Sequence, residues 1–180
     1  MDVDLSKLDL PNLTIVNYPD PRLRIKAAPI ERLDQHVAAL ARRMFELMRA
    51  SKGVGLAAPQ VGVPLRLFVM NHTDDPKNDT VVINPEILDG VQIRESEEGC
   101  LSSPDVRVNV RRPSRCRLVA QNLKGERIEL DGDDLPARVW QHETDHLNGV
   151  LIIDRMSPTD KIAVRKKLKN LEDKFKKGAK

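Results

Sequence analysis

The alternation of apolar and polar positions divides the chain into a helical first part, a strand-rich middle and a helical last part. In residues 34–50 the apolar positions recur at helical spacing, which predicts an amphipathic helix with Gly53 as its C-terminal stop. Six later segments are short, rich in β-branched residues and separated by Pro, Gly, Asn and Asp, as is typical of strands in antiparallel sheets. They span residues 65–70, 80–84, 87–94, 106–110, 116–122 and 127–130.

Two more helices are predicted after these strands. Residues 133–149 favour a helix with Asp134 as its N-cap and Gly149 just past its end. A last helix is expected over about residues 157–177. Strands in the middle of the chain and helices toward both ends indicate an α+β fold.

Composition and charge narrow the classes of function. A length of 180 residues suits one domain, residues 1–180. The chain has 30 Lys and Arg against 27 Asp and Glu, which gives a net charge of only +3. We therefore expect no positive electrostatic field strong enough to bind DNA. One Trp, one Tyr and three Phe are too few for a surface on which the bases of single-stranded nucleic acid stack. No apolar run approaches the roughly 20 residues that span a bilayer, so no membrane segment is expected. Two Cys and an N-terminus without an apolar targeting stretch favour the cytoplasm.

The strongest chemical signal is the sequence His142-Glu143-Thr144-Asp145-His146 inside the predicted helix 133–149. Histidines four positions apart lie on one helix face, so both imidazoles can reach one metal ion. Glu143 is placed to take a proton from a water molecule that the metal activates. The alternative is an accidental match of two exposed histidines, but the chain has only four His and two of them stand in this frame.

A catalytic site of this kind needs a third protein ligand and one open position. Glu172 is the only Glu after the motif, but it lies in a Lys-rich segment, and Ile152 stands where metzincin peptidases carry a third His. A cysteine is the remaining candidate. Cys100 lies in a turn bounded by Gly and Pro, whereas Cys116 lies in an alternating strand where a packed thiol is more usual. We therefore expect Cys100 to be the ligand.

A second unusual stretch is the small-residue segment 53–62, which includes Gly53-Val54-Gly55-Leu56-Ala57-Ala58-Pro59-Gln60. It lacks the Gly-Lys-Ser/Thr ending of a phosphate loop and the third Gly of a dinucleotide fingerprint. Small residues allow another backbone to approach closely, and the Gln60 amide can donate a hydrogen bond to a developing oxyanion. A tight structural turn is the alternative interpretation of this segment.

Three stretches together resemble the motifs of the bacterial peptide deformylases. They are the segment 53–60, then Glu98-Gly99-Cys100-Leu101-Ser102, then Gln141-His142-Glu143-Thr144-Asp145-His146-Leu147, in the order and spacing of that family. The likeness covers nearly the whole chain. It implies antiparallel β-sheets that surround a central helix carrying the HExxH motif, with an N-terminal and a C-terminal helix.

The resemblance also implies a metal site and a reaction. The ligands would be Cys100, His142 and His146, and the native ion would be Fe²⁺, with Zn²⁺, Ni²⁺ or Co²⁺ able to substitute. A Cys-His₂ site judged by its ligands alone favours zinc. The reaction is the hydrolysis of a linear formamide, the N-formyl group of the initiator methionine of newly synthesised polypeptides, with release of formate.

The residues of the three motifs fit the steps of that reaction. The metal lowers the pKa of a water molecule, which attacks the formyl carbon, and Glu143 carries the proton to the leaving amine. The metal, the Gln60 amide and the backbone N–H of Leu101 would hold the oxyanion.

Other residues would bind the substrate. The backbone groups of Val54, Gly55 and Gly99 are expected to pair with an extended peptide in the manner of an added strand. The side chains of Val54, Leu135 and Val139 would supply the apolar wall of the methionine pocket.

The roles of five further residues stay open from the sequence alone. Arg138 and Ser96 stand where some family members carry apolar residues, and Arg138 either points outward or lines the pocket entrance with its aliphatic stem. Arg107 either contacts the substrate backbone or lies free on the surface. For Gln141 and Asp145 we expect a supporting role that orients ligands or anchors the helix.

The C-terminal tail, residues 161–180, is strongly basic. Eight Lys and one Arg against Glu172 and Asp173 give it a net charge of +7. It is either a solvated helix face or a contact to the ribosome. Two alternative functions for the chain also stay open, a metallopeptidase of the HExxH type and an RNA-binding protein with a structural metal. His36 and His72 are expected to be surface residues.

Overall fold

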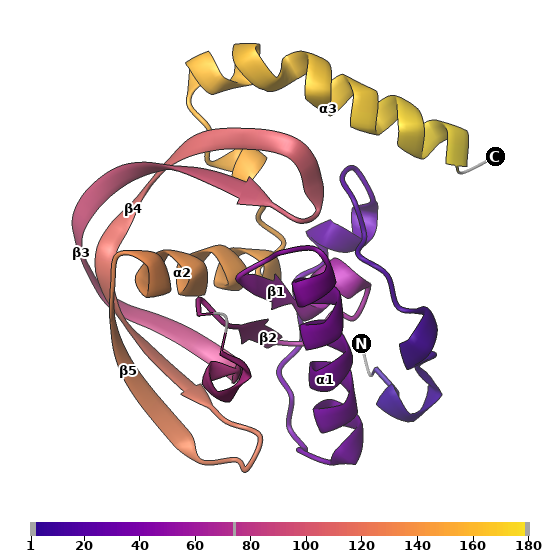
Figure 1. Cartoon of the computed structure of the whole chain (residues 1–180), viewed down its shortest axis with the longest axis vertical. Coiled ribbons are helices and arrows are strands. Elements are labelled where there is room, and N and C mark those ends of the chain that lie inside the picture. Colours follow the sequence, from indigo (N-terminus) through magenta and orange to yellow (C-terminus); the bar gives the residue numbers. More distant parts are fainter. Residues whose placement is uncertain (1–2, 74, 179–180) are drawn as a thin grey trace.

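The computed structural model describes residues 3–73 and 75–178. The described residues form an α+β fold with three α-helices and an antiparallel sheet, which confirms the expected class (Figure 1). The helices are α1 (Gln35–Ala50), α2 (Leu135–Leu147) and α3 (Pro158–Gly178). Residues 1, 2, 74, 179 and 180 lie outside the described part, and with them both ends of the single domain expected over 1–180.

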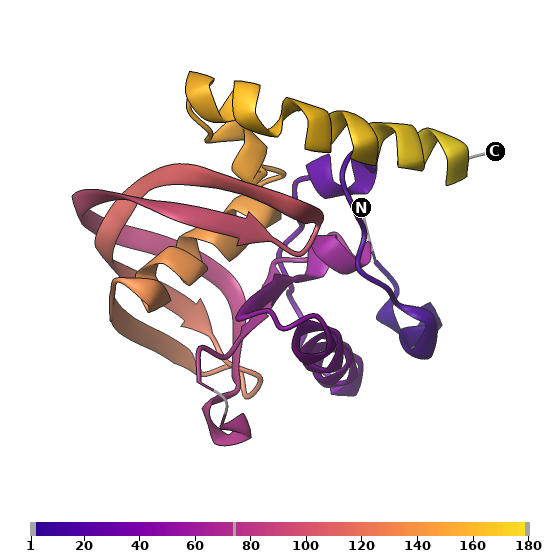
Figure 2. The ribbon, with the colours of Figure 1, turned by 45° about the horizontal axis from the view of Figure 1, so that its top comes forward.

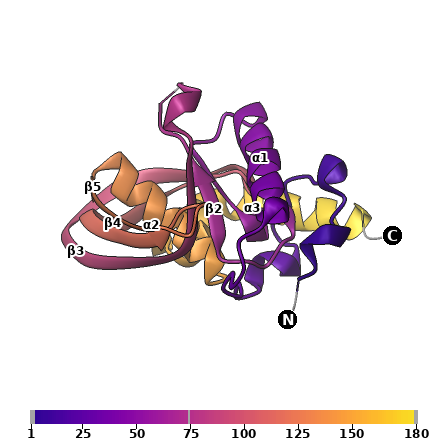
Figure 3. The same ribbon diagram turned by 90° about the horizontal axis from the view of Figure 1, so that it is seen from below.

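The strands form one five-stranded sheet in which neighbours in sequence are neighbours in space. They are β1 (Gly55–Ala57), β2 (Leu67–Met70), β3 (Thr80–Cys100), β4 (Ser103–Gln121) and β5 (Arg127–Asp133). Figure 1 shows β3 and β4 curving around α2, and α2 contacts all five strands. Figure 3 shows α2 beside β3, β4 and β5, with α1 on the other side of β2.

The expectation of six short strands is wrong, because four of them merge into two long ones. β3 has 21 residues and β4 has 19. Asn84 and Asp89, which lie in the expected strands 80–84 and 87–94, have φ angles of 50° and 54° and lie at shifts in the strand register. Such β-bulges bend a strand without ending it. The bends let the hairpin wrap around α2 instead of turning back after each short segment.

The turn between β3 and β4 is short. β3 ends at Cys100 and β4 begins at Ser103, and these two residues are paired in the sheet. Cys100 therefore lies at the tip of the long hairpin.

The first helix, α1, begins and ends where the sequence predicts, but a different residue has the left-handed conformation at its C-terminal end. The Asp34 carboxylate accepts hydrogen bonds from the backbone N–H groups of His36 at 2.9 Å and Val37 at 3.3 Å. At the other end Lys52, not Gly53, has the left-handed conformation, with φ of 55°. Gly53 leaves room for Leu101, because a Cβ there would lie 2.7 Å from Leu101 Cδ1 and this side chain would have to move.

The second helix, α2, is held at both ends by contacts to other segments. Asp134 is the N-cap residue, as predicted, but its side chain makes no capping bond, because its carboxylate accepts a hydrogen bond from Arg94 Nη1 at 2.9 Å. Past the helix end Gly149 has φ of 72°, and a Cβ there would lie 2.5 Å from the backbone oxygen of Arg24. The close approach of Gly149 to Arg24 holds this end of α2 against the N-terminal segment, whereas the Asp134–Arg94 pair at its start is exposed to solvent.

The third helix, α3, lies on the surface. Figure 2 shows it running across the molecule above the curved strands, and Val164 is its only buried residue among those described. Tyr18 Oη donates a hydrogen bond to Glu172 Oε1 at 2.8 Å, which ties α3 to the N-terminal segment. Among the described residues, no helix combines the length and the apolar character needed to cross a membrane.

Candidate metal centre

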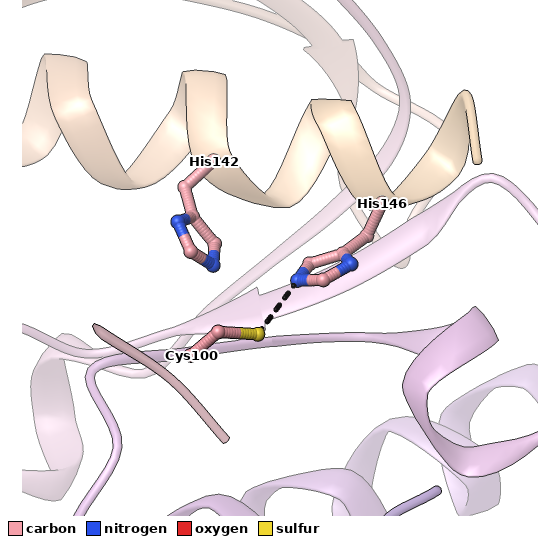
Figure 4. A group of neighbouring side chains, drawn as sticks. All are labelled: Cys100, His142 and His146. Carbon is pink, nitrogen blue, oxygen red and sulfur yellow. Dashed lines mark hydrogen bonds between the residues drawn. The ribbon is translucent and has the colours of Figure 1, made fainter. Parts of the chain in front are cut away.

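Three side chains from two distant segments meet at one point. His142 and His146 project from one face of α2 toward Cys100 at the hairpin tip (Figure 4). Cys100 Sγ lies 3.2 Å from His146 Nε2, and one ligand atom of each of the three residues lies within 4.8 Å of the others. One sulfur and two imidazole nitrogens at this spacing suit a four-coordinate transition-metal ion with one position left for another ligand.

His146 is fully enclosed in the fold. Burial lowers the pKa of His146 well below its usual value, so its imidazole is neutral, the form that binds a metal. Its Nδ1 atom is buried and has no hydrogen-bond partner in the described part of the chain. Its Nε2 atom faces Cys100.

His142 is oriented by a buried carboxylate. Its Nδ1 atom lies 3.0 Å from Glu98 Oε2. Burial opposes the ionisation of Glu98, but hydrogen bonds from His142 and Arg112 outweigh it and hold the pKa of Glu98 well below its usual range. A carboxylate at Nδ1 places the imidazole proton there and leaves Nε2 free for a metal. Sequence reasoning gave Glu98 no role, although it lies within the second motif.

A buried ion-pair network continues from Glu98 along the back of α2. Arg112 donates to both oxygens of Glu98, at 2.7 and 3.0 Å, and through Nη1 to Asp145 Oδ2 at 2.7 Å. Arg155 Nε donates to the same Asp145 oxygen at 2.6 Å. Gln141 Nε2 donates to the backbone oxygen of Pro113 at 2.9 Å. These contacts agree with the supporting roles expected for Gln141 and Asp145, whereas no sequence pattern pointed to Arg112.

Glu143 lies beside the three candidate ligands with its carboxyl group against the backbone of β1. Its side chain is buried, and a Cβ on Gly55 would lie only 2.4 Å from Glu143 Oε1. Burial raises the pKa of Glu143 to about 7. Oε2 is buried and makes no hydrogen bond to any described residue. The carboxyl group is therefore available to exchange a proton with a bound molecule.

Gln60 presents its amide N–H groups to the centre. The backbone N–H of Ala57 donates to Gln60 Oε1 at 2.8 Å. Because the oxygen is occupied, Nε2 faces the other way, 3.1 Å from Ser102 Oγ and 3.5 Å from Cys100 Sγ. The amide is thus fixed as a hydrogen-bond donor next to a candidate metal ligand.

A cavity of about 710 Å³ opens in front of these groups. It is lined by Cys100, His142, Glu143, Gln60 and Leu101, and by all five residues expected to bind substrate, Val54, Gly55, Gly99, Leu135 and Val139. β1 is an edge strand of the sheet, so one side of its backbone is free to pair with an added strand.

The structure places three residues whose roles the sequence left open. Arg138 lines the cavity and its side chain turns inward to Glu98. Arg107 also lines the cavity, with a largely exposed side chain. Ser96 is exposed on β3 and is not part of the cavity wall.

The second cysteine and the other two histidines lie away from the centre. Cys116 is buried among apolar residues, and this burial raises the pKa of its thiol to about 11. His72 is exposed and His36 is half-buried on α1, and neither belongs to the group of candidate ligands.

A family model and similar curated proteins point to the same family. A family model described as polypeptide deformylase matches residues 12–162. The peptide deformylase of Thermotoga maritima is 46% identical over 155 residues, which cover 86% of this chain and 93% of that protein. That of Acidobacterium capsulatum is 43% identical over 160 residues, which cover 88% and 94%.

Solved structures of peptide deformylases have the same fold as this chain. A plant peptide deformylase superposes with a TM-score of 0.91 at 38% identity, covering 98% of this chain and 96% of that chain. A peptide deformylase from Plasmodium falciparum superposes with a TM-score of 0.88 at 37% identity, covering 91% and 97%.

Proposed function

The chain belongs to the polypeptide deformylase family, and from this premise we propose that the cavity beside Cys100, His142 and His146 is its catalytic site. The protein is a hydrolase that removes the N-formyl group from the N-terminal formyl-methionine of newly synthesised polypeptides and releases formate. The observation that carries the site assignment is the buried carboxyl group of Glu143 beside three convergent ligand atoms. A purely structural metal site needs a fourth protein ligand and no such carboxyl group.

The ligands are proposed from the donor set, and the identity of the ion from the resemblance to the family. Cys100, His142 and His146 would hold one divalent ion, which we propose to be Fe²⁺, with Zn²⁺, Ni²⁺ or Co²⁺ able to replace it. A thiolate and two imidazoles suit each of these ions. When bound, the ion polarises the formyl carbonyl and lowers the pKa of water toward ~7.

Glu143 moves the proton of the reaction. Its free carboxylate oxygen takes a proton from the attacking water, whose oxygen forms the new bond to the formyl carbon. The same carboxyl group then delivers the proton to the amine nitrogen as the C–N bond breaks. The products are formate and the free amino terminus, so atoms and charge balance. Because its pKa lies near 7, Glu143 can both accept and release this proton at neutral pH.

Gln60 and Leu101 stabilise the charge that develops on the formyl oxygen. Gln60 Nε2 is held as a donor by the bond between its oxygen and Ala57, and the Leu101 backbone N–H lies in the turn directly after Cys100. Loss of one such donor typically costs about 10²- to 10³-fold in rate.

The rest of the cavity wall would bind the peptide. Val54 and Gly55 on one side and Gly99 on the other line the cavity, where their backbone would flank an extended substrate. Leu135 and Val139 on α2 face the side chain of the first residue. We place α2 as the central helix of the catalytic fold, since it contacts every strand and carries both histidines.

The basic helix α3 is proposed as a contact to the ribosome, and the cytoplasm as the location of the protein. Lys166 and Lys169 are exposed on this helix. The double reversal Lys166→Glu/Lys169→Glu should weaken co-sedimentation with ribosomes at low salt, because phosphate contacts are electrostatic. A matched reversal away from α3, Lys77→Glu/Lys124→Glu, should leave it unchanged. Equal loss in both variants, or no loss in either, would reject the contact.

The proposed site is tested with Glu143→Ala. The variant should keep its metal, because the three ligands are intact, while formate release from a formyl-Met tripeptide falls at least about 10²-fold. The exposed Glu129→Gln change on β5 serves as the control and should retain full activity. Formate release by Glu143→Ala at the wild-type rate would remove Glu143 from the mechanism. Cleavage of an unformylated peptide by the wild type would instead favour a metallopeptidase.

A further inference from the structure

Arg138 occupies an unusual place for a charged residue. It lies on α2 one turn before His142, so both side chains project from the same helix face. Its side chain is 14% exposed and lines the cavity with Leu135 and Val139. A guanidinium group in an otherwise apolar part of the wall needs specific partners to offset its desolvation.

The Arg138 guanidinium connects α2 to both long strands. Nη1 donates to Glu98 Oε1 at 2.7 Å and to the backbone oxygen of Val110 at 3.1 Å. Nη2 donates to the backbone oxygen of Arg94 at 3.1 Å. Glu98 and Arg94 belong to β3 and Val110 to β4, so one side chain holds both strands of the hairpin to the helix.

The contact to Glu98 completes the hydrogen bonding of that carboxylate. Oε1 accepts from Arg112 Nε and from Arg138 Nη1, each at 2.7 Å. Oε2 accepts from Arg112 Nη2 and lies against His142 Nδ1, each at 3.0 Å. The carboxylate that orients His142 is thus itself held in place by two guanidinium groups. A Lys side chain carries its three N–H donors on one nitrogen, so it cannot reproduce contacts that Arg138 makes from two separate nitrogens.

We propose that Arg138 is a positioning residue, which fixes Glu98 toward His142 and thereby slows the release of the catalytic metal. Its aliphatic stem forms a wall of the pocket for the first side chain, so the pocket and the metal centre share one residue. The place of Arg138 in the substrate pocket rests on the proposed function, whereas its effect on Glu98 concerns metal retention alone.

The test compares metal release from Arg138→Leu with that from the wild type. Leu keeps an apolar wall, and Glu98 keeps Arg112 and His142, so the fold should persist, which urea unfolding of the metal-free proteins checks. The Zn²⁺-loaded proteins are mixed with a chromophoric chelator. Release should be about three- to tenfold faster in Arg138→Leu, at or below the lower end of the effects typical of groups that support ligands, because Arg112 still holds Glu98. Arg138→Lys should rescue only part of the difference.

Arg94→Ala is the matched control. It removes a guanidinium of β3 near the same end of α2, and among the described residues the Arg94 side chain pairs only with Asp134. The backbone oxygen that Arg138 contacts remains. Metal release from this variant should equal that from the wild type. Equal release from Arg138→Leu and the wild type, or equal acceleration in Arg94→Ala, would overturn the proposal.

A spectroscopic and a kinetic readout separate positioning from general loosening of the fold. The Nδ1 proton of His142, followed by ¹⁵N-histidine NMR of the zinc form, should exchange with solvent faster in Arg138→Leu. For formyl-Met peptides kcat should fall more than KM rises. Absence of formate release by the wild type would refute the proposed function, while the zinc and NMR results would still decide the role of Arg138.

Discussion

The two helices of the second half, α2 and α3, place charged residues in opposite environments. α2 buries Glu143, Asp145 and His146, and each of these faces a defined partner, a candidate ligand or the cavity. α3 is longer, yet Val164 is its only buried residue among those described. In α2 the identity of each polar residue is constrained by one or two neighbours, whereas in α3 only the density of charge is constrained. Substitutions should therefore have large, specific effects in and around α2 and small, interchangeable effects in α3.

The largest effect is expected from the loss of a ligand that faces α2. Cys100→Ala removes the only sulfur of the centre, so stoichiometric metal and activity should both be lost, with a fall in rate of more than about 10³-fold. Metal analysis after dialysis and formate release measure the two effects. Cys116→Ala is the matched thiol control and should retain the metal. Full metal content in Cys100→Ala would show that the centre lies elsewhere.

The next effect concerns the network on the back of α2. Arg112→Leu leaves Glu98 and Asp145 buried with fewer partners, and breaking a buried ion pair typically costs about 3–5 kcal/mol. The free energy of unfolding in urea measures the loss. Arg112→Lys, which keeps the charge, should recover part of it. A change below about 1 kcal/mol in Arg112→Leu would mean that this network does not constrain α2.

A smaller effect is expected from crowding Glu143 without replacing it. In Gly55→Ala the new methyl group would overlap Glu143 Oε1, so the carboxyl group must move. We expect kcat to fall about 10²-fold, the lower end for the loss of proton transfer, with the metal retained. Combined with Glu143→Ala, the same change should cause little further loss. Additive losses in the double variant would show that Gly55 acts independently of Glu143.

The smallest effect is expected in α3. Lys166→Glu/Lys169→Glu should change the free energy of unfolding by less than about 0.5 kcal/mol and leave formate release from a free peptide unchanged, because both side chains face solvent. Urea unfolding and steady-state kinetics check this. A loss of activity on a free peptide would show that α3 supports the catalytic site, and the contrast with α2 would fail.

The sequence predicts those parts of the molecule that depend on local periodicity. The helix 34–50 and the last helix agree closely with α1 and α3, because apolar spacing and flanking residues define them. The strand lengths were wrong because Pro85 and Pro113, which separate the expected segments and usually interrupt strands, lie within β3 and β4. The global curvature around α2, not the local sequence, decides between a bulge and a turn.

The candidate site, like the fold, has residues that the sequence predicts and residues that it does not. The motif that contains His142 and His146 is a local pattern, and the choice of Cys100 over Cys116 followed from its position in a turn; the structure brings these three residues together. Arg112 and Arg138 carry no motif, and their partners lie 14 to 44 positions away in the sequence. Long-range pairing of single arginines with a buried carboxylate leaves no signal in one sequence. The catalytic roles of Glu143, Gln60 and Leu101 stay predictions.

The hairpin tip that carries Cys100 has a consequence for unfolding. Cys100 and His146 are 46 positions apart, so an ion held by both would act as a reversible cross-link that closes a long loop. Such a link stabilises the folded chain in proportion to the logarithm of the free ion concentration. The melting temperature of the protein should therefore rise with added metal, and chelation should return it to a constant lower value.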